Sequence, residues 1–399
     1  MSKLIVSHSD LDGVASALIA KKFISEKYQE NAEAILVDYD CAIDVILEEF
    51  ASEKYDEIWI TDISIREPEV FKKMKQHTNI RVIWIDHHAS SIYQDWMDVC
   101  IIEEGNKECA ASLLYKYCKT LIDFNSHHWD YLARYARDID LWRQKYQRAH
   151  ELSMIISGLG AQRLFQILDN DIDRLFHFTP EMERALKKSY ENLEASLHMA
   201  TATKETTDLD NGLTLISAVC NGFPSIVGDK LGGDRIIVSL VDLKNKSISL
   251  RTKSANVNLP DINFGVHEIA ERFEYKGRRG GGHPAAAGAP ASDDIFKSLS
   301  QNLAVVIENI TRDIVKTKFL QKHAEHIELA REALLRECKE MQGAEAIDLD
   351  NENGCIDITF EKKFDPIRKL MTVRVNKSTK EAQVLKNENG SKNDKGSGS

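Results

Sequence analysis

The sequence predicts an α/β protein built on a parallel sheet, with a second, smaller α/β domain further along the chain. In the first 90 residues, short apolar runs rich in β-branched residues alternate with stretches of helical spacing. Parallel strands that helices cover on both faces produce this alternation. Strand-like runs return after residue 212, behind a long stretch that reads as helix. Several runs of the first half also end directly in His or Asp, which indicates where a site would form.

The elements of the first half follow one another in a regular order. We expect four strands, at residues 4–7, 35–37, 58–60 and 81–85. Helical spacing follows the first and second strands, and Pro68 after the third suits the first turn of a helix. From about residue 109 to 142 the pattern is helical again.

The second half divides by composition into further parts. Strand patterns lie at residues 213–219, 235–241 and 247–250, a glycine-rich segment at 277–288 and helical patterns at 295–342. We therefore predict five parts: a first α/β domain (1–150), a helical linker (151–209), a second α/β domain (210–310), a C-terminal extension (311–386) and a disordered polar tail (387–399).

Composition and charge narrow the class of protein. The 399 residues carry a formal net charge of −11, whereas a protein that grips long nucleic acid usually needs a broad basic surface. The seven scattered cysteines form no C-x-x-C, and no apolar run suits a signal peptide or a membrane span. These features predict a cytoplasmic protein with reduced thiols and no membrane partner.

The segment from His8 to Gly13 places three metal-ligand types at alternate positions. In an extended chain, His8, Asp10 and Asp12 face the same side, and Gly13 allows a turn into the helix. Asp62 and Asp86 end neighbouring strands of the predicted sheet. So many carboxylates in one crevice repel each other unless cations compensate them, and divalent metals are the natural candidates. Two ions roughly 3.5–4 Å apart could clamp a phosphate group.

Each part of this pattern has an ordinary interpretation when taken alone. A lone D-x-D-G is more often a turn or a helix cap, and a lone His-His pair is usually structural, as we expect for His127 and His128. The combination differs, because acidic ends on successive strands are joined to Asp86, His87 and His88 in one run. The joint pattern favours the metal site.

These motifs, in this order, resemble the DHH phosphoesterase family. The resemblance covers roughly residues 3–142 for a Rossmann-like DHH domain and 210–300 for the companion DHHA1 domain. The second carries its own signature, three glycines followed by His283 and then a run of small residues. The resemblance implies a hydrolase that uses two divalent cations, with Mn²⁺ the expected metal.

The resemblance also implies a ligand set. One metal would be held by His8, Asp10 and Asp62. The other would be held by Asp12, Asp62, His87 and a later aspartate, with Asp62 bridging. Two aspartates could be this last ligand, and Asp138 is favoured over Asp140 because an aromatic follows it four residues later. Asp86 would orient the histidines, and His88 would contact the substrate phosphate.

The glycine-rich segment has a physical logic of its own. Successive glycines let a substrate lie on the backbone, where exposed N–H groups can hold an anion. A Rossmann phosphate loop fits poorly, because Ala285 stands where that motif needs its third glycine. Residues 240–280 hold eight basic and five acidic residues, so positive charge is concentrated here. The predicted substrate-binding residues are His88, Arg251, Arg278, Arg279, Gly281, Gly282 and His283. Solvated surface charge is the alternative role for the arginines.

Several substrates stay open within this family. The glycine–histidine signature argues against inorganic pyrophosphatases, and we find neither the added nucleic-acid-binding module of RecJ-type exonucleases nor the membrane segments of cyclic-dinucleotide enzymes. The pattern is most similar to bacterial oligoribonucleases, which release mononucleotides from very short RNA. A 3′-phosphoadenosine 5′-phosphate phosphatase and a cyclic mononucleotide (cAMP or cGMP) phosphodiesterase are the alternatives. A non-enzymatic nucleotide sensor is the alternative of another class, and a homodimer is compatible with any of them.

Overall fold

The computed structural model describes most of the chain. Described are residues 2–88, 91–103, 107–124, 126–209, 212–253, 257–259, 262–275, 278–293, 300–352, 355–364 and 367–385. The polar tail predicted at residues 387–399 lies outside them. The chain divides into two compact units, one formed mainly by residues 1–304 and the other by residues 305–385 with short segments near 209 and 258–264.

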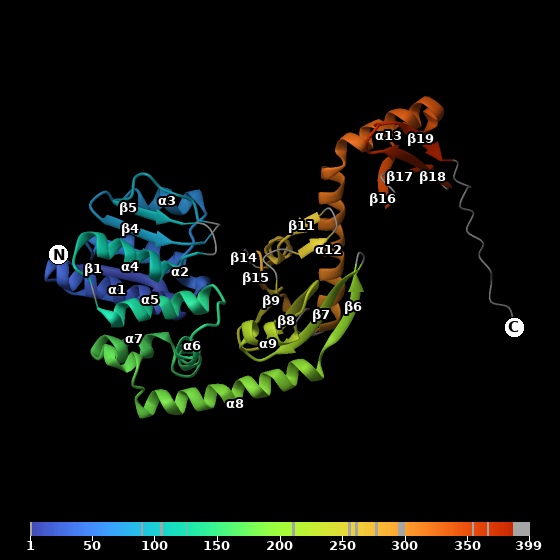
Figure 1. Cartoon of the computed structure of the whole chain (residues 1–399). Helices are drawn as coiled ribbons and strands as arrows, with labels where there is room; N and C mark the ends of the chain where they lie inside the picture. Colours follow the sequence, from blue (N-terminus) through green and yellow to red (C-terminus); the bar gives the residue numbers. More distant parts are fainter. Residues whose placement is uncertain are drawn as a thin grey trace. The chain divides into compact units, whose positions relative to one another are not determined.

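A five-stranded parallel sheet forms the first half of the larger unit, in the order β2-β1-β3-β4-β5 (Figure 1). Its strands are β1 (Lys3–His8), β2 (Ala32–Val37), β3 (Glu57–Thr61), β4 (Arg81–Asp86) and β5 (Val99–Ile102). All four adjacent pairs are parallel, so the carboxyl ends of the strands share one edge. The predicted α/β class and parallel sheet are confirmed. Strand β5 was not predicted.

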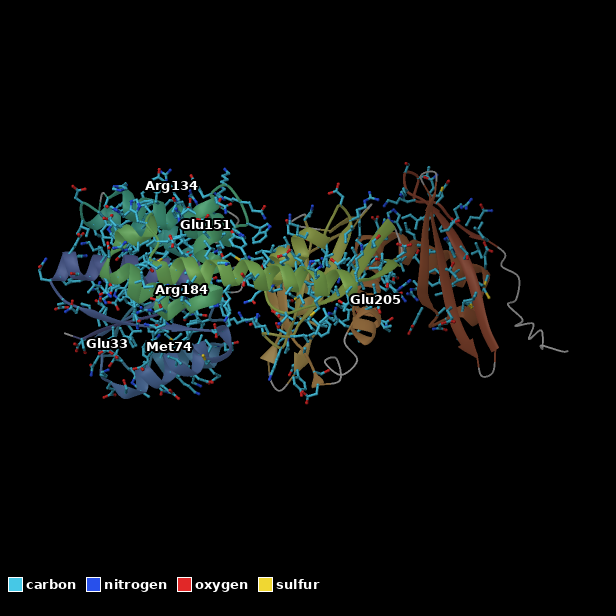
Figure 2. All side chains as sticks on the ribbon, turned by 90° about the horizontal axis from the view of Figure 1, so that it is seen from below. Glu33, Met74, Arg134, Glu151, Arg184 and Glu205 are labelled. Carbon is cyan, nitrogen blue, oxygen red and sulfur yellow. The ribbon has the colours of Figure 1, made fainter. Side chains whose placement is uncertain are left out.

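Helices cover both faces of this sheet. The helices are α1 (Leu11–Tyr28), α2 (Tyr39–Ser52), α3 (Pro68–Met74), α4 (Ala110–Leu121) and α5 (His127–Asp140). On one face, α1, α4 and α5 pack on alternate strand residues such as Ile5, Trp59 and Ile83. On the other, α2 and α3 cover Ile58 and Trp84. Polar side chains such as Glu33 and Arg134 point outward (Figure 2). The sheet is therefore buried on both faces.

The segment predicted as a linker has two different roles. Helices α6 (Gln147–Leu159) and α7 (Ala161–Asn170) contribute Leu152, Leu164 and neighbours to the core around α1, and a short 3₁₀ turn (Ile172–Leu175) follows. Helix α8 (Pro180–Ala202) leads on to the second sheet, and its Leu193 shares a small core with Met154 of α6 and residues of that sheet. In the chain, α8 thus leads from the helices of the first sheet to the second sheet.

The second sheet has six strands in the order β14-β15-β9-β8-β7-β6. They are β6 (Glu205–Leu209), β7 (Leu213–Cys220), β8 (Ile236–Asp242), β9 (Ser247–Arg251), β14 (Gly281–His283) and β15 (Ala286–Pro290). Helix α9 (Pro224–Leu231) connects the parallel pair β7 and β8, and the remaining described pairs are antiparallel. Between β9 and β14 lie α10 (Val266–Ala270) and four short strands, β10 (Val257–Leu259), β11 (Ile262–Phe264), β12 (Glu274–Tyr275) and β13 (Arg278–Arg279). Gly281, Gly282 and His283 of the glycine-rich segment therefore form the terminal strand β14 of this sheet.

The smaller unit contains a sheet that the sequence interpretation missed. After α12 (Ser300–Lys322), α13 (Ala324–Glu337) and a 3₁₀ turn (Lys339–Met341), four antiparallel strands follow. They are β16 (Glu345–Glu352), β17 (Cys355–Phe364), β18 (Ile367–Asn376) and β19 (Ala382–Leu385). Alternate residues of β17, from Ile356 to Phe360, are buried beneath Leu334 of α13. That period of two was the available signal.

None of the helices in the described parts of the chain is long and apolar enough to cross a membrane.

Candidate metal centre

The site lies at the shared carboxyl edge of the first sheet. His8 ends β1, Asp62 follows β3 and Asp86 ends β4, so three adjacent strands each deliver one residue. Asp10 caps α1, where its Oδ1 accepts a hydrogen bond from the N–H of Gly13 at 2.9 Å. A Cβ atom on Gly13 would lie 1.9 Å from the carbonyl oxygen of His8. Glycine is therefore required for the tight turn that brings the helix residues back to the strand end.

His8, Asp10 and Asp62 form the first group of potential ligands. One donor atom from each lies within 4.8 Å of the others. Nδ1 of His8 is 3.2 Å from Oδ2 of Asp10 and 3.7 Å from Oδ2 of Asp62. The structure thus brings together three residues that the sequence resemblance assigned to one metal.

Asp12, His87 and Asp140 form the second group, again within 4.8 Å of one another. Nε2 of His87 lies 3.4 Å from Oδ2 of Asp140 and 3.9 Å from Oδ2 of Asp12. The first turn of α4 fixes Asp12, because the N–H groups of Ala110 and Ala111 each donate to its carboxylate at 2.8 Å. This contact also places a helix N-terminus, which favours negative charge, beside the group.

Asp62 lies between the two groups. Its Oδ2 faces His8, while its Oδ1 is 3.6 Å from Nε2 of His87. The backbone of Asp62 has φ of +57°, in the left-handed region that few residues other than glycine, Asn and Asp adopt readily. Single non-glycine residues in this conformation are concentrated at functional sites. The turn points the buried carboxylate towards both histidines.

The geometry favours Asp140 as the later candidate ligand, whereas the sequence favoured Asp138. Asp138 is buried, but both of its oxygens accept backbone N–H groups, from Lys145 and Tyr146, at 3.0 Å. It shapes the turn after α5 and takes no part in the ligand groups found among the described residues. Asp140, two residues later on the helix, presents its carboxylate to His87.

Four inward-facing atoms are left without hydrogen-bond partners among the described residues. They are Nδ1 of His8, Oδ2 of Asp62, Nε2 of His87 and Oδ2 of Asp140. Buried polar atoms rarely stay unpaired, and here all four point into the two groups. Burial and the neighbouring aspartates raise the pKa of Asp62 and of Asp140 well above the usual value for Asp. A donor set of crowded carboxylates and imidazoles fits a divalent metal ion, which would satisfy the orphaned atoms and offset the repulsion.

Asp86 and His88 form a pair beside these groups. Oδ1 of Asp86 is 2.8 Å from Nδ1 of His88, and Ser91 also donates a hydrogen bond to the Asp86 carboxylate. Burial opposes the charge on both partners, but the attraction of Asp86 outweighs it and raises the pKa of His88 to about 9. The same pairing lowers the pKa of Asp86 despite its burial. Asp86 thus contacts one of the two histidines, His88.

His283 of the second sheet joins the site. Its ring stacks on those of His87 and His88, with centroid separations of 5.6 and 5.3 Å. Burial, followed by the nearby His88 and His87, lowers its pKa to about 4, so His283 is neutral near pH 7. The strand register places Ala286 opposite His283 on one side and opposite Arg251 on the other.

Arg251 is partly buried in the second sheet. Its Nη2 donates to the Ser225 hydroxyl at 2.8 Å, and its buried Nε has no partner among the described residues. Burial lowers its pKa to about 10, so the guanidinium remains charged near pH 7. An anion near this side chain would therefore meet a cation whose charge no described carboxylate neutralises.

The other predicted substrate residues have different surroundings. Gly281 and Gly282 lie in strand β14. Gly282 has φ of +140°, and a Cβ there would lie 2.7 Å from the backbone of Ala286. Arg279 is exposed and donates to the carbonyl of Glu271 at 2.9 Å, which favours a structural role for it. Arg278 lies in β13, and its side chain is outside the described set.

Two residues near the site were missed in the sequence. The hydroxyl of Tyr39, the first residue of α2, lies 2.8 Å from Nε2 of His88. The guanidinium of Arg66 lies against Gly281, 3.3 Å from the position of a Cβ atom there. Both follow strands of the first sheet closely, β2 for Tyr39 and β3 for Arg66. Their place at the carboxyl edge was the signal that could have identified them.

Comparisons with known proteins agree with this architecture. Residues 2–139 match the model of the DHH family, N-terminal domain. Oligoribonuclease NrnB of Bacillus subtilis (strain 168) is 23% identical over 317 residues, which cover 73% of this chain and 74% of the relative. The match therefore extends beyond the first sheet.

Solved structures share the fold. RecJ of Thermus thermophilus in complex with Mn²⁺ superposes with a TM-score of 0.53 and 14% identity, over 96% of this chain and 67% of RecJ. A DHH domain from a protein described as a member of a ribosomal protein family gives a TM-score of 0.52 and 15% identity, over 79% of this chain and 87% of that one. At these identities the likeness shows the fold alone.

Proposed function

Because residues 2–139 match the model of the DHH family, N-terminal domain, we propose that this chain is a metal-dependent phosphodiesterase that releases mononucleotides from short RNA oligonucleotides. The observation that carries the proposal is the pair of ligand groups that meet at Asp62, with His88 and His283 beside them. The relation to a protein named oligoribonuclease supports RNA as the substrate.

Two divalent cations are part of the proposal. His8, Asp10 and Asp62 would hold one, and Asp12, Asp62, His87 and Asp140 the other. Metal ions in such sites lower the pKa of bound water and offset charge on phosphate oxygens. Mixed imidazole and carboxylate donors suit Mn²⁺ better than Mg²⁺, and the RecJ of similar fold is in complex with Mn²⁺.

The chain's own residues would position the phosphate. Asp86 holds Nδ1 of His88, and Nε2 of that ring, which contacts the Tyr39 hydroxyl, is the atom that would also contact a substrate oxygen. A His88 imidazolium, which its raised pKa favours, can donate a hydrogen bond to that oxygen. Arg251 supplies a fixed positive charge on the second sheet for another phosphate of the same substrate.

Charge supports a short substrate. Positive residues are concentrated in residues 240–280, whereas the whole chain carries −11. Phosphates that extend beyond the site would gain little compensation and would be repelled by the acidic remainder. We therefore expect a preference for oligonucleotides of about two to five residues.

A length series tests this proposal. We would compare kcat/KM for a trinucleotide RNA and for a strand of roughly two dozen nucleotides, at low and high salt with Mn²⁺. The trinucleotide should be cleaved faster, and salt should narrow the gap by screening the repulsion. A long strand cleaved equally well at low salt contradicts the short-substrate proposal. If the metal-bound protein cleaves neither of the two RNAs, the proposal that it is an RNA-hydrolysing enzyme is contradicted.

A further inference from the structure

Tyr39 connects two parts of the candidate site that the ligand assignment treats separately. Its hydroxyl oxygen lies 2.8 Å from Nε2 of His88, whose Nδ1 is held by Asp86. Its ring packs on the ring of His8, with centroids 4.2 Å apart and planes inclined by 35°. One side chain from α2 thus contacts a ligand of the first group and the histidine proposed to meet substrate.

The fold explains why Tyr39 is in this position. Strand β2 is the neighbour of β1 in the sheet, and Val37 at its end pairs with His8. The chain then passes through Asp38, which accepts a hydrogen bond from Ser9, and enters α2 at Tyr39. The side chain is 46% exposed, so Tyr39 is at the rim of the site and not part of a closed core.

The contacts define what each part of Tyr39 can do. With Asp86 at Nδ1 and Tyr39 at Nε2, both nitrogens of His88 are held, which fixes the rotation of the ring. The aromatic ring covers one face of His8 and restricts its movement while Nδ1 points at Asp10 and Asp62. Contacts that orient catalytic and ligand histidines typically change activity or metal affinity by about 10–100-fold when removed.

We propose that Tyr39 is a positioning residue with two separable functions: its hydroxyl aligns His88 for the substrate phosphate, and its ring aligns His8. The part of this inference that concerns substrate rests on the proposed function of the site. The alignment itself is a property of the protein that can be measured without any substrate.

Two substitutions separate the functions. Tyr39→Phe removes the hydroxyl and keeps the ring, whereas Tyr39→Ala removes both. Tyr93→Phe is the matched control, because Tyr93 is 65% exposed and has no assigned role in the site. Each variant would be examined as the full chain for kcat and KM on a trinucleotide, and for metal affinity by calorimetry.

The expected results differ between the variants. Tyr39→Phe should lower kcat about tenfold or more and leave metal affinity unchanged, with KM within about twofold of the parent value. Tyr39→Ala should in addition weaken metal binding by roughly 10–100-fold. Tyr93→Phe should behave as the parent. If Tyr39→Phe has the parent's kcat, or weakens metal binding as much as Tyr39→Ala, the division of functions is wrong.

A spectroscopic measurement distinguishes failure of this inference from failure of the proposed function. Imidazole ¹⁵N spectra of the chain loaded with diamagnetic Mg²⁺ report the hydrogen bond at Nε2, with His88→Ala providing the assignment. Tyr39→Phe should shift the His88 Nε2 signal and leave that of His87 in place. An unchanged His88 signal overturns the inference even if the enzyme is active. A shifted signal in a chain that hydrolyses no RNA supports the alignment and rejects only the catalytic proposal.

Discussion

Asp140 and Asp138, two residues apart on α5, should respond in opposite ways to the same substitution. The carboxylates of Asp140 and Asp12 each place an oxygen within 4.8 Å of the other. Two unit charges at that separation repel each other by about 3.5 kcal/mol at an effective dielectric constant of about 20. Proton uptake relieves part of this repulsion. Asp140→Asn should therefore stabilise the metal-free protein by about 1–3 kcal/mol while abolishing the stabilisation that metal provides.

The pH dependence gives the sign of this effect an independent check. Burial, followed by the charge of Asp12, raises the pKa of Asp140 in the folded protein well above its unfolded value. The folded state therefore binds more protons than the unfolded state. The free energy of unfolding falls as the pH rises from the pKa of Asp140 in the unfolded chain through its pKa in the folded protein. The gain in unfolding free energy that Asp140→Asn gives over the parent, without metal, should be larger at pH 8 than at pH 5.

Asp138→Asn is the matched control. The N–H of Lys145 lies 3.0 Å from both oxygens of Asp138, so in either orientation of an asparagine the amide NH2 would face this backbone donor. We expect a loss of about 1–3 kcal/mol with or without metal, and parent-like metal affinity.

Tryptophan fluorescence suits this assay, since all five tryptophans lie between residues 59 and 142 and report on the first domain. Thermal unfolding would be followed in chelator and in Mn²⁺. Loss of metal binding in Asp138→Asn, with Asp140→Asn binding normally, would refute the geometric assignment.

Three further predictions use the same chain. Asp62→Ala should abolish turnover and bound metal together, because its two oxygens face both histidines; near-parental turnover would contradict a shared ligand. Gly13→Ala should impair folding of the first domain, since its Cβ would meet the His8 carbonyl at 1.9 Å, and a parental unfolding midpoint in chelator would contradict this. Arg251→Ala or His283→Ala should raise KM while bound metal, measured by elemental analysis, stays constant; loss of metal with unchanged KM would mean that these residues act on the metal groups.

Much of the site could be predicted because its residues are local to strand ends. His8, Asp10 and Asp12 are separated by single residues, and Asp62 and Asp86 directly follow apolar runs. In a parallel sheet such ends meet at one edge whatever the details of packing. The convergence of these residues therefore followed from the alternation of strands and helices alone.

The choice between Asp138 and Asp140 could not be made in this way. Residues two apart on a helix point about 200° from one another, so one of them faces the site and the other faces away. Which one does so depends on how α5 packs against α1 and α4, and on the turn that offers its N–H groups to Asp138. A spacing to a later aromatic residue carries no information about that rotation.

The sequence by itself therefore predicted the α/β class and the edge at which the candidate ligands gather, because these depend on local periodicity, and the family resemblance implied how most of the candidates are grouped. Tertiary structure alone decided that Asp140 enters the second group, that Tyr39 reaches His88 from the end of β2, and that His283 stacks on the histidines of the first sheet. These are contacts between residues far apart in the chain. They follow from the order of strands in a sheet and the rotation of helices upon it, and both are set by packing across the whole domain rather than by the pattern of any one segment.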